Sequence, residues 1–327
     1  MQPNRQDYAL LVALGAVWGS SFLLIKWAVE TIPPATVATG RIVIAALVLL
    51  VIIAARGSAL PRTLRVWRLL AIMGLVGNIV PFTLINWGEV RIDSSLTAIL
   101  MSTVPLATIF LAPAFVPDEP ISAGKIAGVV FGMVGVAALI GPSALARAHG
   151  ELFGELAVTA AALCYALNGL LARRLPQMPV EVISAGALLC AAVVGLPVSL
   201  LVDRPWQITP SMGSLAALIC LGIMNTAGAY LLLFRLTMRA GAGFASFNNF
   251  LVPLFGVMWG VLLLGEQLSS QTAGGLLLIL AGLAATRLWP GKHRAHGFQP
   301  SARLRHPPAP RGDQNPQEPI RAQARSD

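Results

Sequence analysis

Ten apolar runs, each about as long as a helix that crosses a bilayer, constrain the fold of this chain more than any other feature. The hydrocarbon core of a bilayer is roughly 30 Å thick and needs about 20 residues of helix. Only 11% of the residues are charged, against about 25% in a soluble domain, so lipid must solvate much of the surface. We predict an all-α polytopic membrane protein with ten transmembrane helices. The runs lie near residues 8–29, 34–55, 67–88, 95–116, 122–141, 152–172, 181–202, 212–234, 243–264 and 270–289.

The first run is expected to remain as a membrane span. It is too long for the apolar region of a cleaved signal peptide, and Arg5 is the only basic residue that precedes it.

The second half of the chain repeats the first at a constant offset of 147 residues. Matches between apolar residues alone would carry little weight, but many of the matched residues are polar, aromatic or charged. These pairs are Trp18 and Tyr165, Ser21 and Asn168, Lys26 and Arg173, Asn78 and Asn225, Ser102 and Asn249, and Glu119 and Glu266. Each half holds five helices, an odd number, so the second half enters the membrane upside down. We therefore predict an inverted repeat, which is typical of secondary transporters, with units at 1–146 and 147–290.

Basic residues are distributed unequally between alternate loops. If the N-terminus is cytoplasmic, the inner loops hold the basic residues at 56–68, 173–174 and 235–239. The outer loops then keep Arg91, Arg147 and Arg204. The positive-inside rule predicts that both termini are cytoplasmic, in a bacterial cell (inner) membrane.

The end of the chain differs in composition from the rest. Residues 291–327 are rich in Pro, Arg, Ala and Gln and have almost no large apolar residues, so they are predicted to form a disordered basic cytoplasmic tail. The tail and the inner loops account for most of the net charge of +9. This charge therefore does not indicate nucleic-acid binding.

Three segments carry a resemblance to a known family. They are VWGSSFLLIKWA at 17–28, PPATVATGRIVIAALVLL at 33–50 and FNNFLVPLFGVMWGVLLLGEQLS at 247–269. Together with the ten runs, they resemble the EamA-type family of the drug/metabolite transporter superfamily over residues 8–289. The resemblance implies transport of amino acids, their derivatives or other small metabolites, usually without ATP. The run near 152–172 departs from the family pattern, because Tyr-Ala-Leu-Asn stands at 165–168 where the first run has Trp-Gly-Ser-Ser.

Six residues form two matched sets, each with one aromatic and two polar side chains. Residues three apart on a helix are neighbours, so the aromatic and the first polar residue of each set share a face. We predict that all six line one cavity between the halves and contact the substrate. The alternative is that each set bonds helix to helix within its own half. The residues are Trp18, Ser21, Ser102, Tyr165, Asn168 and Asn249.

Two prolines and several charged residues complete the predicted site. Pro105 and Pro253 are expected to kink their helices beside the cavity. Lys26 and Arg41 either meet a substrate carboxylate or phosphate at the cavity mouth, or anchor at headgroups. In the second case they could also pair with Glu30 or Glu89.

Two glutamates near helix starts have a structural and a functional interpretation. Glu266 and Glu119 precede the expected N-cap residues Ser269 and Ser122. There they stabilise a helix terminus through its dipole, or they take part in proton coupling.

The function that fits these features is a secondary transporter, most simply an exporter, that works by alternating access. Runs one to four and six to nine would form the cavity, and runs five and ten would support them. A lipid or lipid-precursor flippase on the same fold is the alternative. A membrane-embedded enzyme is disfavoured because all four histidines lie in a loop or the tail, and a single-chain ATP-driven pump is excluded by the absence of G-x-x-x-x-G-K-[ST]. We expect no cofactor and no metal, a small-molecule substrate and lipid as partners, and a monomer or homodimer.

Overall fold

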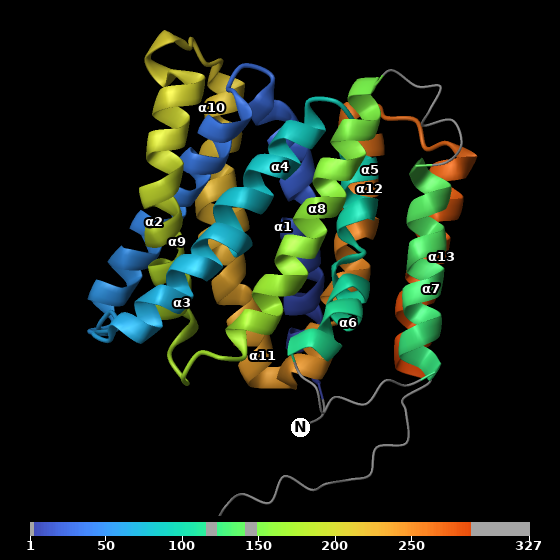
Figure 1. Ribbon diagram of the computed structural model, residues 1–327, viewed down its shortest axis with the longest axis horizontal. Coiled ribbons are helices and arrows are strands. Elements are labelled where there is room, and N and C mark those ends of the chain that lie inside the picture. The colour runs from blue at the N-terminus through green and yellow to red at the C-terminus, as the bar shows by residue number, and fades with distance from the viewer. Residues whose placement is uncertain (1–2, 116–122, 141–148, 289–327) are drawn as a thin grey trace, which may run out of the picture. The chain divides into compact units, whose positions relative to one another are not determined.

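The computed structural model describes residues 3–115, 123–140 and 149–288, and Figure 1 shows them as coloured ribbons. These residues belong to a compact unit that extends from Met1 to Gly291. The predicted tail at 291–327, with Glu119 and Ser122, lies outside the described residues. Within the described ranges every regular element is a helix, which agrees with the predicted fold class.

The first half of the chain contains seven α-helices and one π-helical segment. They are α1 (Arg5–Val29), α2 (Pro34–Ala55), α3 (Leu64–Gly74), the π-helix η1 (Leu75–Ile79), α4 (Val80–Glu89), α5 (Ser94–Met101), α6 (Val104–Phe115) and α7 (Ala123–Ile140).

Within the described residues, the second half contains six α-helices, two π-helices and one 3₁₀-helix. It contains α8 (His149–Ala172), α9 (Val180–Val198), the π-helix η3 (Ser199–Asp203), the 3₁₀-helix η4 (Pro205–Gln207), α10 (Met212–Cys220), the π-helix η5 (Leu221–Gly228), α11 (Ala229–Ala245), α12 (Asn248–Leu264) and α13 (Ser270–Leu288).

Seven helical segments of the described chain are long and apolar enough to cross a membrane. They are Arg5–Val29, Pro34–Ala55, Leu64–Glu89, Ser94–Phe115, Gly150–Ala172, Val180–Asp203 and Met212–Ala245. Three further apolar helices are shorter: Ala123–Leu139, Asn248–Leu264 and Ser270–Thr286. The chain is therefore an integral, multi-pass membrane protein, as predicted.

The predicted eighth run lies within the segment Met212–Ala245, and the predicted ninth run contains the shorter helix α12. Gly241 has φ of 84° and ψ of 157°, which interrupts the 34-residue segment Met212–Ala245. The predicted ninth run, near 243–264, begins directly after this glycine. It is broken again at Ser246 and Phe247 before α12 starts, so α12 alone falls short of a full span.

Both halves also contain a helix break or π-helix near the middle of an apolar run. The break between α5 and α6 lies at Ser102 and Thr103, whose hydroxyls donate to the carbonyls of Ile99 and Leu100, each at 2.6 Å. Pro105 follows in the first turn of α6 and has no N–H for the helical ladder. Pro253 lies inside α12.

The helices pack in a small number of close pairs. The pairs are α1 with α12, α2 with α9, α4 with α8, α5 with α12, and α7 with α13. Figure 1 shows α7 and α13 side by side. The largest apolar cluster lies mainly between α2 and α9 and includes Ile42, Leu49 and Leu188.

Glycines at four-residue and seven-residue spacing let α7 and α13 approach closely. A Cβ atom added at Gly282 would lie 2.8 Å from the carbonyl oxygen of Gly128, which is closer than van der Waals contact. A Cβ atom at Gly275 would meet the side chain of Leu139 at 2.4 Å. These two glycines therefore allow the close packing of α13 against α7, whereas a Cβ at Gly274 would meet nothing within 4 Å.

We expect Gly282→Ala to destabilise the protein by about 1 kcal/mol, because the new methyl group must push α13 away from the main chain of α7. Gly274→Ala is the matched control on the same helix, and it should leave stability unchanged or slightly raised. Thermal unfolding of the two variants in the same detergent measures the difference. Equal melting temperatures would contradict the close approach at Gly282.

Candidate functional site

A cavity of about 310 Å³ lies among the helices of both halves. Its walls come from α1, α2, α4, the break between α5 and α6, α8, the junction of η5 with α11, and α12. The structure places all six predicted cavity residues on these walls, together with both predicted kink prolines. They are Trp18, Ser21, Ser102, Tyr165, Asn168 and Asn249, with Pro105 and Pro253.

Two hydroxyls of the predicted set already have partners within the protein. Ser102 Oγ donates to the carbonyl of Ile99, and Ser21 Oγ accepts from Asn225 Nδ2 at 3.1 Å. Ser102 therefore satisfies a carbonyl at the break between α5 and α6, whereas Ser21 joins α1 to η5. The alternative for the polar residues was that they bond from helix to helix within their own half. Ser21 does bond to another helix, but its partner Asn225 lies in the other half.

Among the described residues that line the cavity, Arg41 of α2 is the one with a charged side chain. Its side chain is only 6% exposed. The Nε atom donates to Thr226 Oγ1 at 2.7 Å, and the guanidinium lies over the ring of Phe82, 4.1 Å from its centroid. These contacts fix the plane of the guanidinium and leave both terminal nitrogens for another partner.

Arg41 has no carboxylate partner among the residues that the structure describes. The predicted pairing with Glu30 or Glu89 does not occur: the ion pairs at hand are Arg56 with Glu181, at 2.7 Å, and Arg239 with Asp7, at 2.8 Å. A buried cation without a partner is costly, so an anionic group that enters the cavity is stabilised by Arg41.

Two amide oxygens on the same wall lack a hydrogen-bond donor. Asn168 Oδ1 and Asn248 Oδ1 are both inaccessible to solvent and unpaired, and the side chain of Asn248 is only 3% exposed. The Asn168 amide packs against η1, because a Cβ atom at Gly77 would lie 2.4 Å from its Cγ. Buried acceptors of this kind favour a ligand that donates hydrogen bonds.

Aromatic rings form another part of the wall. Trp18, Phe82, Tyr165 and Tyr230 all line the cavity. Phe82 and Tyr165 meet edge to face, with centroids 6.4 Å apart, and the Tyr230 hydroxyl donates to Asn78 Oδ1 at 3.4 Å.

The sequence did not identify Phe82, Thr226 or Tyr230 as site residues, and it left Asn248 open between bonding to another helix and lining a cavity. Each of these side chains is positioned by a π-helix or a helix break, and neither feature has a clear signal in an apolar sequence. Only the amide pair at 248–249 drew attention to Asn248.

The other charged residues predicted at the mouth lie away from the cavity wall. Lys26 Nζ donates to the main-chain oxygens of Glu89, at 2.7 Å, and Ile92, at 2.8 Å. It therefore binds the main chain of Glu89 and makes no ion pair with the Glu89 carboxylate. The Glu89 side chain is completely buried.

Glu266 stabilises a helix start that lies far away in sequence. Its carboxylate accepts from the backbone nitrogens of Ser94, at 2.7 Å, and Ser95, at 2.9 Å, and from the Ser95 hydroxyl. A carboxylate at a helix N-terminus is favoured by the helix dipole. Glu266 therefore stabilises a helix start, as one of the two interpretations predicted, but the helix is α5 and not the one that follows Ser269. Ser269 caps α13 as predicted, since its Oγ accepts from Thr272 N at 3.0 Å.

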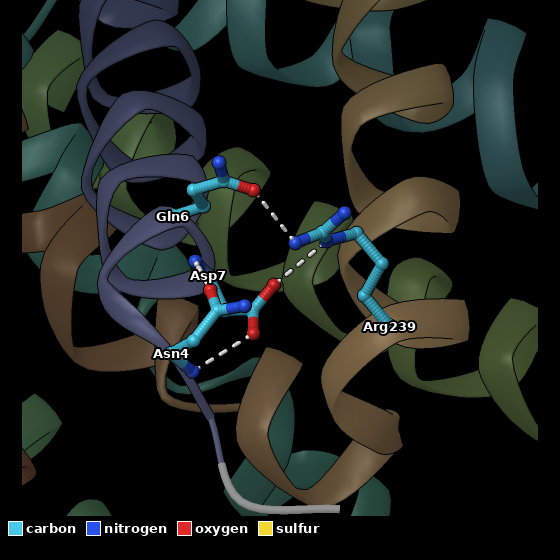
Figure 2. Close-up of polar contacts among 4 residues, drawn as sticks. All are labelled: Asn4, Gln6, Asp7 and Arg239. Atoms are coloured by element: carbon cyan, nitrogen blue, oxygen red, sulfur yellow. Dashed lines mark hydrogen bonds and ion pairs between the residues drawn. The ribbon is translucent and has the colours of Figure 1, made fainter.

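Two ion pairs join helices around the cavity at the ends predicted to be cytoplasmic. Figure 2 shows one of them: Arg239 of α11 donates to Asp7, at 2.8 Å, and to Gln6, at 3.0 Å. Asp7 also forms a reciprocal capping box with Asn4 at the start of α1. The second pair, Arg56 with Glu181, joins the end of α2 to the start of α9.

Comparison with known proteins identifies the family. The model of the EamA-like transporter family matches residues 7–141 and again residues 152–288. The uncharacterized inner membrane transporter YedA of Escherichia coli K12 is 28% identical over 270 residues, which cover 80% of this chain and 84% of YedA. The "Probable amino-acid metabolite efflux pump" of Salmonella typhimurium is 27% identical over 290 residues, which cover 86% of this chain and 94% of the pump.

A crystal structure of a protein with 21% sequence identity superposes with a TM-score of 0.63 and covers 88% of this chain and 98% of that chain. At this identity the likeness establishes the fold alone. The family match is broader, because it includes most of both halves, and it confirms the resemblance carried by the three sequence segments. The chain belongs to the EamA-like transporter family.

Proposed function

We propose that this protein is a secondary transporter that exports small metabolites such as amino acids or their derivatives across the bacterial inner membrane. The observation that carries the proposal is the cavity in which Arg41, without a carboxylate partner, lies among aromatic rings and unpaired amide oxygens. The volume of about 310 Å³ is at the small end of the range for ligand pockets, roughly 300–1,000 Å³.

The polar groups of the wall match the two ends of a zwitterion. A carboxylate can accept two parallel hydrogen bonds from the terminal nitrogens of Arg41, the geometry that a guanidinium favours. An ammonium group can donate to Asn168 Oδ1 and Asn248 Oδ1 once the two amide side chains turn these buried oxygens toward the cavity. The rings of Trp18 and Tyr165 then offer an apolar surface to the ligand's side chain.

The names of relatives agree with this substrate class. The pump of Salmonella typhimurium is named for amino-acid metabolites and for efflux. Its similarity to this chain supports both the class of substrate and the direction of transport.

An inverted repeat of ten membrane-crossing helices is the architecture we propose, with units at 1–146 and 147–290. The family model matches once in each unit. The packing pairs support the repeat as well. In the repeat, α1 corresponds to α8, and α12 corresponds to α5 together with α6. The contact of α1 with α12 therefore corresponds to the contact of α8 with α5 and α6. The same exchange leaves the pairs α2 with α9 and α7 with α13 unchanged.

The π-helices η1 and η5 also correspond in the repeat, but their asparagines bond differently. Asn225 in η5 donates to the carbonyl of Val17 and to the hydroxyls of Ser20 and Ser21 on α1. Its repeat partner, Asn78 in η1, instead donates at 3.4 Å to the carbonyl of Met73 in its own helix. In an inverted repeat one half rocks against the other, and the unequal bonding of the two asparagines supports transport by alternating access. The basic residues of the predicted inner loops support cytoplasmic termini.

Transport assays on the two amides test the proposed site. Asn168→Ala and Asn249→Ala should each lower uptake of the preferred amino acid into proteoliposomes, by about 10-fold for Asn168→Ala, which removes an acceptor for a charged donor. The probe is a panel of radiolabelled amino acids in a counterflow assay, at equal reconstituted amounts of protein.

Asn4→Ala is the control for this experiment, because Asn4 caps α1 away from the cavity. Its transport should remain near that of the unmodified protein. If both cavity variants transport with unchanged kinetics, these amides do not contact the substrate. If no amino acid of the panel is transported, the proposed substrate class is wrong.

A further inference from the structure

The last residue of α4, Glu89, is a buried acid that the cavity does not use. Its side chain is 0% exposed, and neither carboxyl oxygen has a hydrogen-bond donor. An ionised carboxylate in that environment would lose several kcal/mol of hydration without compensation. The arrangement therefore favours a neutral carboxylic acid, which holds one proton.

Asn86 supports this assignment from the same helix face. It lies three residues before Glu89, so the two side chains are neighbours, and it is also completely buried. Its Nδ2 donates to the carbonyl of Pro34 at 3.0 Å, but its Oδ1 has no donor. A protonated Glu89 brings the hydrogen-bond donor that this face of α4 otherwise lacks.

Lys26 is the nearest cation, and its bonding pattern fits a neutral acid. Its ammonium donates to the main-chain oxygens of Glu89 and Ile92 and leaves the Glu89 carboxyl oxygens unpaired. An ammonium beside an ionised carboxylate would form the charge-assisted hydrogen bond, which is roughly twice as strong as a neutral one. These two hydrogen bonds from Lys26, which we call the Lys26 clasp, join α1 to the end of α4 and the turn after it.

Three other charged side chains around Glu89, those of Arg41, Arg91 and Glu266, form hydrogen bonds with groups other than the Glu89 carboxyl. Arg41 of α2 bonds Thr226, and Glu266, which follows α12, bonds the start of α5. Arg91 donates to the carbonyl of Trp87 at 2.8 Å. The remaining acids are Asp93, in the same turn, and Glu155 of α8, beside the Gly154 main chain that contacts Gly88.

The repeat indicates that the fold does not require an acid at this position. At the offset of 147, Glu89 corresponds to Leu236, which is also completely buried. An apolar side chain therefore suffices in the second half, and the carboxyl of the first half has a role beyond packing.

We propose that Glu89 is a proton-binding site that couples transport to proton movement. In the conformation described here the acid is protonated. When the surrounding helices open, its O–H bond breaks, the proton passes to water, and the remaining carboxylate takes the Lys26 ammonium away from the carbonyls of Glu89 and Ile92. Uptake of a proton from the other side restores the clasp. The coupling rests on the proposed transport function, whereas the bound proton can be measured without any substrate.

Infrared spectroscopy of the purified full-length protein tests the bound proton directly. Near neutral pH we expect the C=O stretching band of a protonated carboxylic acid, and Glu89→Gln should remove it while keeping nearly the same shape. Glu266→Gln is the matched control and should retain the band, because three donors bind the Glu266 carboxylate. A band that is missing from the unmodified protein, or that survives Glu89→Gln, overturns the proposal.

Proteoliposomes that contain a pH-sensitive dye test the coupling. An amino-acid gradient should drive proton movement through the unmodified protein, and Glu89→Gln should abolish that movement while exchange of amino acid for amino acid continues. Amino-acid transport without proton movement in the unmodified protein would refute coupling. A protein that transports no amino acid contradicts the proposed function instead, and the infrared result then still decides whether Glu89 holds a proton.

Discussion

Replacing Arg41 by methionine will weaken the apparent affinity for the transported amino acid by about 100-fold. Removing one partner of a buried pair of opposite charges costs about 3 kcal/mol or more, and about 1.4 kcal/mol corresponds to a factor of ten. Methionine keeps an unbranched apolar stem at this position, but it loses the charge and the guanidinium that lies over Phe82. Counterflow measured over a range of substrate concentrations gives the affinity.

The controls for Arg41 separate recognition from folding. Arg41→Lys keeps the charge without the planar pair of donors, so we expect an intermediate loss of about 10-fold. Arg65→Met removes an exposed arginine far from the cavity and should have no effect. In the absence of substrate Arg41→Met should melt at the same temperature or higher, because an unpaired buried charge has been removed. Unchanged affinity in Arg41→Met would contradict the assignment of the carboxylate site.

Asn225→Leu and Asn78→Leu will not be equivalent, although the two residues correspond in the repeat. The amide of Asn225 has three acceptors on α1 within reach and can donate to two of them at once. We expect its loss to destabilise the protein by about 2 kcal/mol. Asn78 makes one long bond within its own helix and accepts one from Tyr230, so its loss should cost less than about 1 kcal/mol.

Thermal unfolding of the two asparagine variants, side by side, measures this difference, and transport assays complete the comparison. Both variants should slow transport, because in the opposite state Asn78 would take the role that Asn225 has here. Equal destabilisation by the two substitutions would show that the asymmetry between η1 and η5 does not exist in the protein.

Residue types and spacing were sufficient to predict much of the fold and of the cavity wall. The run predicted at 34–55 is α2 with the same bounds, because Pro33 and Pro34 mark its start and an apolar stretch follows. The offset of 147 led to Trp18, Tyr165 and Asn168, since a duplicated fold places matched residues on a shared interface. These three side chains all reach the same cavity.

Other features could not be predicted because they depend on local backbone geometry. The π-helices η1 and η5 turn Thr226 and Tyr230 toward the cavity, and an apolar sequence gives no sign of the extra residue in the helical turn. The sequence left Lys26 open between a substrate anion, the headgroups and a glutamate partner, but two main-chain oxygens at the end of α4 satisfy it. Gly241 lies between the runs predicted at 212–234 and 243–264, but its positive φ could not be predicted, because glycines are common in membrane helices.

Accessibility of a single cysteine in the cavity tests the account of alternating access most directly. In a variant that lacks Cys164, Cys190 and Cys220, Ser102→Cys places a thiol on the cavity wall. Ser58→Cys and Gln207→Cys, in loops predicted to face opposite sides, are the reference sites. A membrane-impermeant maleimide should label Ser102→Cys both in intact cells and in inverted vesicles, and the transported amino acid should protect it. Labelling from one side only, or labelling that the amino acid does not change, would contradict a substrate site that opens alternately to the two sides.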